Sequence, residues 1–154
     1  MSPAEELRYL ILAAQREGNR ELARVLRSLG LTPAQAEVLV VLDAGAPLSV
    51  RGLGARLVCE SGSPSRLVAG LIEAGLVERR PSSEDGRVSE LRLTAAGKAA
   101  VEGVRRVEEA LHAAIEAAGS EAELAGVLAV LRRLVADRPA GRAIEFRRRS
   151  CADA

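Results

Sequence analysis

The fold is specified mainly by the stretch from Leu31 to Gly97, which reads LTPAQAEVLVVLDAGAPLSVRGLGARLVCESGSPSRLVAGLIEAGLVERRPSSEDGRVSELRLTAAG. Its helix caps, apolar spacings and change of period predict a helix, a second helix, a turn, a third helix and then a two-stranded ribbon with a charged tip. That order is the order of a winged helix-turn-helix. We therefore expect a mainly α (α+β) fold in which residues 31–95 form a winged helix-turn-helix lobe.

The helix starts are marked by hydroxyl residues that have Glu or Gln three positions later, the pattern of a capping box. The pairs are Ser2 with Glu5, Thr32 with Gln35, and Ser120 with Glu123. Together with the apolar spacing, they predict helices at 3–29, 33–44, 49–58, 63–74, 94–117 and 121–137. Four glycines are expected to close helices because glycine tolerates positive φ: Gly30, Gly45, Gly75 and Gly119.

The apolar period changes to two between Gly75 and Thr94. Leu91 and Leu93 then share one face of a strand, as alternation requires. The intervening residues 81–87 contain Pro, Ser, Asp and Gly, which are typical of an exposed hairpin tip. This ribbon is the predicted wing.

Two apolar bands lie outside the lobe, one in each flanking helical region. They are formed by Leu7, Leu10, Ile11, Ala14, Leu22, Val25, Leu26 and Leu29, and by Leu124, Val127, Leu128, Leu131, Leu134 and Val135. One small lobe cannot cover both bands. We therefore expect residues 1–30 and 96–137 to form a dimerisation platform with a second copy, most simply around a two-fold axis.

The remaining segment, 138–154, contains Pro139, Gly141 and the basic run 147–149. It is interpreted as a mobile, solvated basic tail; a last helical turn that docks Ile144 and Phe146 on a partner subunit is the alternative. At 154 residues, the chain as a whole is expected to be one structural unit.

Composition limits the classes of function. The net charge of +1 does not by itself indicate nucleic-acid binding, so any DNA contact must come from local placement of charge. No apolar run approaches the roughly 20 residues that span a bilayer, which favours a cytoplasmic protein without a membrane partner. The two cysteines, Cys59 and Cys151, form neither a C-x-x-C pair nor a metal cluster, and no motif predicts a cofactor.

The helix predicted at 63–74 is the candidate recognition helix. Leu67, Val68, Leu71 and Ile72 form its inward stripe. A helix fits the major groove and its N-terminal residues reach the DNA, so Ser63, Ser65 and Arg66 are the contact candidates. The fork of Arg66 suits the two acceptors of guanine, whereas the serines suit phosphate oxygens. The alternative for Arg66 is a surface ion pair with Glu60 or Glu73.

The helix predicted at 49–58 would support the recognition helix. Arg51 and Arg56 are expected to lie beside the DNA backbone. Gly52 and Gly54 are each unfavourable inside a helix by about 1 kcal/mol relative to alanine. Either close approach of a neighbour compensates for them or the helix is frayed.

Four segments resemble the MarR family of bacterial transcriptional regulators. They are APLSVRGLGARL at 46–57, RLVAGLIEAGLVERR at 66–80, the D-x-R wing at Asp85 and Arg87, and the L-x-LTxxG return at 91–97. The resemblance covers nearly the whole chain. It implies a homodimer on double-stranded DNA, more often a repressor than an activator, whose lobe spacing responds to a small-molecule effector or an oxidant; the effector here is unidentified.

The resemblance also assigns roles by position. Ser63, Ser65 and Arg66 match recognition-helix contacts, Arg87 matches the wing arginine that enters the minor groove, and Asp85 matches the acid that helps to position it. Gly62, Pro64 and Gly70 depart from the residues usual at their positions. These departures leave the operator sequence open.

Three alternatives to a ligand-responsive DNA-binding regulator stay open to different degrees. A winged helix used only for protein contacts fits the nearly neutral lobe, and salt-dependent duplex binding would separate the two. An enzyme is disfavoured, because the single His112 lies near no acid or cysteine cluster and no nucleophile or phosphate-loop motif is present. A thiol-based sensor would use Cys59, which we expect to be a small core thiol, or Cys151. The peroxide sensors of the resembled family carry their cysteine in the first helix, where this chain has none.

Overall fold

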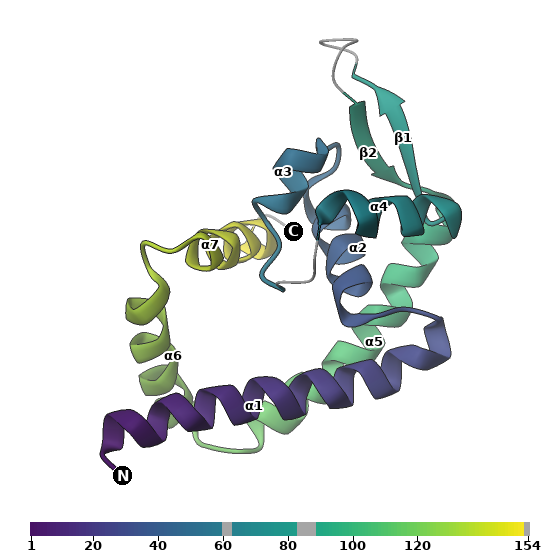
Figure 1. The fold of residues 1–154 in the computed structure, drawn as a ribbon. Helices are drawn as coiled ribbons and strands as arrows, with labels where there is room; N and C mark the ends of the chain where they lie inside the picture. The colour runs from purple at the N-terminus through teal and green to yellow at the C-terminus, as the bar shows by residue number, and fades with distance from the viewer. Residues whose placement is uncertain (60–62, 83–88, 153–154) are drawn as a thin grey trace.

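The computed structural model describes residues 1–59, 63–82 and 89–152, the last three by backbone alone. Its elements in chain order are α1 (Pro3–Leu26), the 3-10 turn η1 (Arg27–Leu29), α2 (Pro33–Gly45), α3 (Val50–Gly54), α4 (Pro64–Glu73), β1 (Val77–Pro81), β2 (Ser89–Leu93), α5 (Ala95–Glu116), α6 (Glu121–Val135) and α7 (Pro139–Ala152). The long helix α1 runs beneath the lobe built from α2 to β2. Helices α5 and α6 lead away from that lobe and α7 returns to it (Figure 1).

Helix α2 forms the centre of the lobe. The predicted capping box of Thr32 and Gln35 starts it, and Val38, Leu39 and Leu42 are completely buried on it. The core around them consists of Leu26, Leu53, Val68, Leu71, Val77, Leu91, Val101 and Val104. Aliphatic side chains from every part of the lobe therefore hold α4 and the wing against α2.

The ribbon is antiparallel, as its period predicts. Val77 pairs with Leu93 and Arg79 with Leu91, and Leu48 adds one bridge to Leu91 on the other side. Leu91 is completely buried, while Arg79 and Arg92 are exposed. The base of the wing is thus anchored in the core.

All three predicted capping boxes are present. Among the described residues, Gly30 at 67° and Gly75 at 71° are the glycines with positive φ, which confirms two of the four predicted helix stops. The predictions for Gly45 and Gly119 are wrong. Gly45 is the last residue of α2, which ends in the extended Ala46, and Gly119 precedes the Ser120 cap that starts α6.

Helices α1 and α6 leave large apolar side chains in solvent within this single chain. The most exposed include Leu10 and Leu134, both at 59%. The N-terminal part of the α1 band, with Leu7, Leu10 and Ile11, and the α6 band are therefore available for a second copy, whereas Leu26 at the end of α1 is completely buried in the lobe core. Among the described residues no single helix is long and apolar enough to cross a bilayer; the pair 3–29 and 33–45 meets the limits only together, with a bend of 75° between them.

The prediction of a mobile tail at 138–154 is wrong. Residues 139–152 form α7, which packs against α2 of the same chain, and Phe146 lies against the lobe core. Docking on a partner subunit is therefore not needed to cover Phe146. Ile144, at 36% exposure, stays at the surface.

Candidate nucleic-acid interface

Helix α4 has one buried and one exposed face. Val68 and Leu71 are completely buried, and Leu67 and Ile72 pack against the same core, which confirms the predicted inward stripe. Ser63, Ser65 and Arg66 are exposed at its N-terminal end. The packing of the stripe thus fixes the direction in which these three side chains project.

The N-terminus of α4 is open to a ligand. Ser63 is the cap residue, yet its side chain makes no capping hydrogen bond, and Pro64 occupies the first helical position. Among the described residues Arg66 forms no ion pair, so the alternative pairing with Glu73 is not found; Glu60 lies outside the described residues. Hydroxyls, an arginine and a helix N-terminus together suit an anionic partner.

Helix α3 is shorter than predicted, because it ends at Gly54 and the chain turns at Ala55. A Cβ on Gly54 would lie 3.1 Å from Cγ of Pro64, so close approach of α4 is one reason for this glycine. Arg51 is exposed, and its place beside a DNA backbone stays a prediction.

Arg56 does not fit its predicted role. Its Nη1 donates to the carbonyl of Gly52 at 2.7 Å, and its guanidinium lies 4.4 Å from the ring centre of Phe146. The side chain is half-buried between α3 and α7. Arg56 therefore closes α3 and contacts Phe146, and it is not a free phosphate contact.

Glu37 is the residue that the sequence analysis missed. It is 7% exposed, and its Oε1 accepts a hydrogen bond from the Val58 amide at 2.7 Å, while its Oε2 accepts one from the Cys59 amide at 2.9 Å. A carboxylate inside the apolar run of α2 was the available signal, since a buried acid needs partners. These two bonds hold the turn between α3 and α4 on α2.

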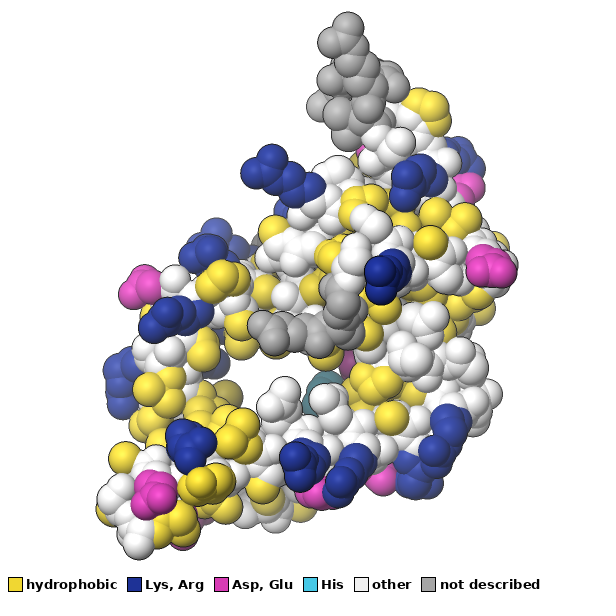
Figure 2. Space-filling view, in the orientation of Figure 1, with side chains coloured by type: hydrophobic (Ala, Val, Ile, Leu, Met, Phe, Trp, Pro, Cys, Tyr) yellow, Lys and Arg dark blue, Asp and Glu magenta, His cyan; other side chains and the backbone are white. Residues whose placement is uncertain are grey.

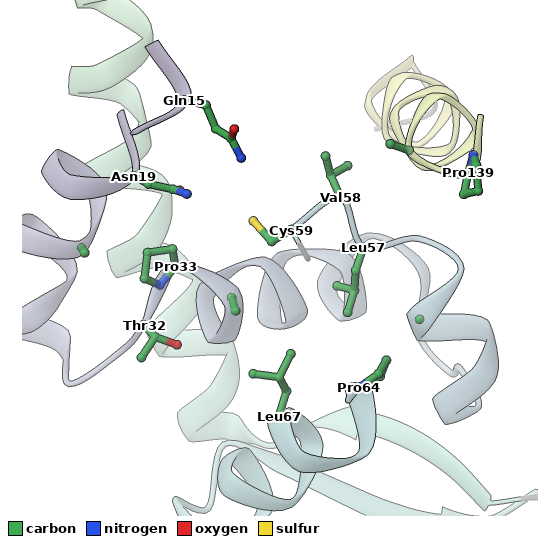
Figure 3. Close-up of a pocket in the computed structure, with 14 residues that line it drawn as sticks. Gln15, Asn19, Thr32, Pro33, Leu57, Val58, Cys59, Pro64, Leu67 and Pro139 are labelled. Atoms are coloured by element: carbon green, nitrogen blue, oxygen red, sulfur yellow. The ribbon is translucent and has the colours of Figure 1, made fainter. Parts of the chain in front are cut away.

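The prediction of Cys59 as a buried core thiol is wrong, because its side chain is exposed. The bond from its amide to Glu37 fixes the backbone, and the thiol points into a hollow beside α1 (Figure 3). Partial loss of hydration, followed by the nearby Glu37 carboxylate, raises the pKa of this thiol to about 11. An exposed cysteine with a raised pKa is a weak nucleophile at neutral pH.

We expect alkylation of Cys59 by iodoacetamide to be slow at pH 7 and to accelerate about tenfold per pH unit, because the reactive thiolate increases in that proportion below the pKa. The acceleration should continue toward a pKa of about 11. A Cys151→Ser variant isolates the reaction, and mass spectrometry measures its rate. A rate that is already maximal at pH 7 would contradict the raised pKa and restore the sensor alternative.

The hollow beside Cys59 has a volume of about 1190 Å³ and is open to solvent. Its described lining comes from α1, the start of α2, the turn before α4 and the start of α7. Gln15 and Asn19 supply amide groups opposite Cys59, whereas Leu57, Val58 and Leu67 supply apolar surface (Figure 3). An occupant could contact both the lobe and the first platform helix.

The remaining basic side chains, His112 and the predicted wing contacts belong to parts of the chain other than α4. On the face drawn in Figure 2, basic side chains are dispersed over several elements and do not form one continuous patch. His112 is exposed on α5. Asp85 and Arg87, the predicted wing contacts, lie outside the described residues. The described groups that the fold brings to one end of α4 are therefore Ser63, Ser65 and Arg66.

Known proteins share this arrangement. The MarR family model matches residues 29–88. Over 92 residues the chain is 27% identical to the HTH-type transcriptional repressor IacR of Pseudomonas putida, covering 60% of this chain and 55% of that protein. Over 97 residues it is 29% identical to the organic hydroperoxide resistance transcriptional regulator of Bacillus subtilis (strain 168), covering 63% and 66%. The chain thus spans less than two thirds of either relative.

A solved structure of a MarR mutant from E. coli complexed with operator DNA superimposes with a TM-score of 0.76 at 27% identity, over 84% of this chain and 94% of that one. The buried stripe of α4, its open N-terminus and the anchored wing define a winged helix-turn-helix protein. The family match covers this same lobe, and the fold match extends over the platform helices. The chain is therefore similar to the MarR family, in sequence over residues 29–88 and in fold over most of its length.

Proposed function

We propose that this chain is a sequence-specific DNA-binding transcriptional regulator, a repressor that acts as a homodimer and is released by a small-molecule effector. The observation that carries the proposal is the N-terminal end of α4, where Ser63, Ser65 and Arg66 project from a helix fixed by its buried face. The MarR–operator complex supports it, because that relative has the same fold. A cytoplasmic location and the absence of enzymatic activity accompany the proposal.

In the proposed complex α4 enters the major groove. Arg66 reads a base edge with its guanidinium, while Ser63 and Ser65 bind phosphate oxygens. Arg51 on α3 lies beside the DNA backbone, and Arg87 of the wing, oriented by Asp85, enters the minor groove. Two such lobes on a two-fold axis would read half-sites about one DNA turn, roughly 34 Å, apart.

Replacement of Arg66 by alanine is expected to weaken binding to the preferred site by about 1 to 3 kcal/mol and binding to random duplex much less, since a bidentate contact to guanine discriminates between bases. Fluorescence anisotropy with both duplexes at one salt concentration measures the difference. Arg20→Ala is the matched control, because it removes an arginine that is 67% exposed and belongs to α1, outside the helix-turn-helix. Equal losses of binding free energy on both duplexes would indicate that Arg66 contacts a phosphate and not a base.

The hollow beside Cys59 is our candidate for the effector site, because its lining joins the lobe to α1. Its mixture of amides and aliphatic groups suits a small, partly polar molecule. Ring stacking has little support, since Tyr9 and Phe146 are the aromatic residues of the chain and neither lines the hollow among its described residues.

A further inference from the structure

Helix α7 is joined to the lobe through its inward face. Ala143 is 1% exposed, and Phe146 packs against the core cluster. A Cβ on Gly45, the last residue of α2, would lie 2.8 Å from Cζ of Phe146. The end of α2 is therefore shaped to receive this ring, although the two residues lie a hundred positions apart in the chain.

A second glycine fixes the path of α7. Gly141 is buried in the first turn of α7, and a Cβ there would lie 2.0 Å from the carbonyl oxygen of Val135, the last residue of α6. A backbone atom cannot move aside as a flexible side chain can. The sequence thus carries glycine at both places where the return of α7 requires a close approach.

From this position α7 reaches the turn between α3 and α4. Nη2 of Arg147 donates to Oε1 of Glu37 at 2.7 Å, the same oxygen that accepts the amide of Val58. Glu37 is 7% exposed and the Arg147 side chain 36%. One buried carboxylate therefore joins α2, the turn and α7.

Phe146 reaches the other end of the same turn. Its ring lies 4.4 Å from the guanidinium carbon of Arg56, which in turn closes α3 through the carbonyl of Gly52. Two consecutive residues of α7 therefore act on the two ends of residues 56–59. Phe146 contacts Arg56 directly, and Arg147 acts on Val58 and Cys59 through Glu37. Residues 56–59 precede α4 in the chain; residues 60–62, between them and the Ser63 cap, lie outside the described residues.

We propose that α7 is a clamp on the helix-turn-helix, in which Arg147 and Phe146 are positioning residues that set the placement of residues 56–59 and, through them, of α4. The physical basis is the buried carboxylate. With Arg147 present its charge is compensated, and both oxygens can hold the turn amides. Without Arg147 the carboxylate is driven toward water, and its bonds to the turn weaken. The consequence for DNA rests on the proposed function; the consequence for the turn does not.

Hydrogen exchange of the Val58 and Cys59 amides tests the clamp in the full chain. Arg147→Met, which keeps an apolar stem and removes the charge, should accelerate exchange of these two amides about tenfold while the buried amides of α2 change little. Arg147→Lys should restore most of the protection, because it returns the cation. Arg148→Met is the matched control: this neighbour pairs with Glu145 at the surface, and its loss should change neither amide.

Unchanged exchange of the two amides in Arg147→Met would overturn the clamp, because it would mean that α7 and the turn are not coupled. An equal acceleration across all of α2 and α4 would also overturn it, because it would mean general destabilisation of the lobe. Gly141→Ala provides a second variant if Arg147→Met is poorly folded, because it displaces α7 while Glu37, Arg147 and residues 56–59 keep their wild-type side chains. It should give the same local pattern at Val58 and Cys59. Protection at wild-type level in Gly141→Ala would equally overturn the clamp.

A DNA titration separates this inference from the proposed function. If the wild-type chain binds duplex DNA, Arg147→Met should weaken binding several-fold and Arg148→Met should not. Loosened turn amides with unchanged affinity would overturn the claim that α7 places α4 for DNA. A wild-type chain that binds no duplex would overturn the proposed function, while the exchange result would still decide whether α7 holds the turn.

Discussion

A double variant, Leu128→Glu with Leu134→Glu, is expected to be monomeric at micromolar concentration and to lose binding to a two-half-site operator. The two leucines are 47% and 59% exposed on α6 in the single chain. Burial of a leucine contributes about 1.5 to 3 kcal/mol, and a two-fold interface uses each position twice. The free-energy cost of placing four carboxylates in such an interface would exceed the free energy of association of most dimers. Sedimentation equilibrium measures the mass directly.

Ala129→Glu is the control for this variant, because it adds the same charge to the opposite, exposed face of α6. It should remain dimeric. A wild-type chain that sediments as a monomer, or a double variant that sediments as a dimer, would show that the α6 stripe is not the interface.

Glu37→Ala is expected to lower the free energy of unfolding by about 3 kcal/mol, the lower end of the range for breaking a buried ion pair. The lower end applies because Arg147 is 36% exposed and can turn to water. The change also leaves the amides of Val58 and Cys59 without their acceptor. Urea unfolding followed by circular dichroism, at one fixed protein concentration, gives the difference.

Glu145→Ala is the matched control, since this acid pairs with Arg148 at the surface and both side chains are about half exposed. Its loss should cost less than about 1 kcal/mol. Equal effects of the two substitutions would mean that Glu37 contributes no more than an ordinary surface pair, and the central position that we give it would be wrong.

The sequence predicted those parts of the fold that depend on neighbours along the chain. Capping boxes at Ser2, Thr32 and Ser120 are local, and so are the stripe of α4 and the alternation of the wing. Each was predicted and each is present. The same holds for the exposed end of α4, because a helix that buries one face must present the other.

The sequence did not predict the contacts that depend on distant residues. Pro139, Gly141 and the arginine run suggested a tail, but α7 is stabilised by the fit of Phe146 to Gly45 and of Arg147 to Glu37, which no local period reveals. Arg56 was assigned to DNA for the same reason, since its actual partner Phe146 lies ninety positions away. Cys59 was placed in the core because the local sequence does not reveal that its amide donates a hydrogen bond to a buried acid on α2, twenty-two positions away.

Selection of bound fragments from random duplex DNA is the most direct test of sequence-specific binding by this chain, because it requires no knowledge of the operator. We expect enrichment of a pseudo-palindrome whose half-sites are centred about one helical turn apart and which is bound by two chains, and we expect the preference to be reduced in Arg66→Ala. Failure to enrich any sequence above the starting pool, at low salt and with a folded dimer, would contradict a sequence-specific DNA-binding function and favour a winged helix that serves protein contacts.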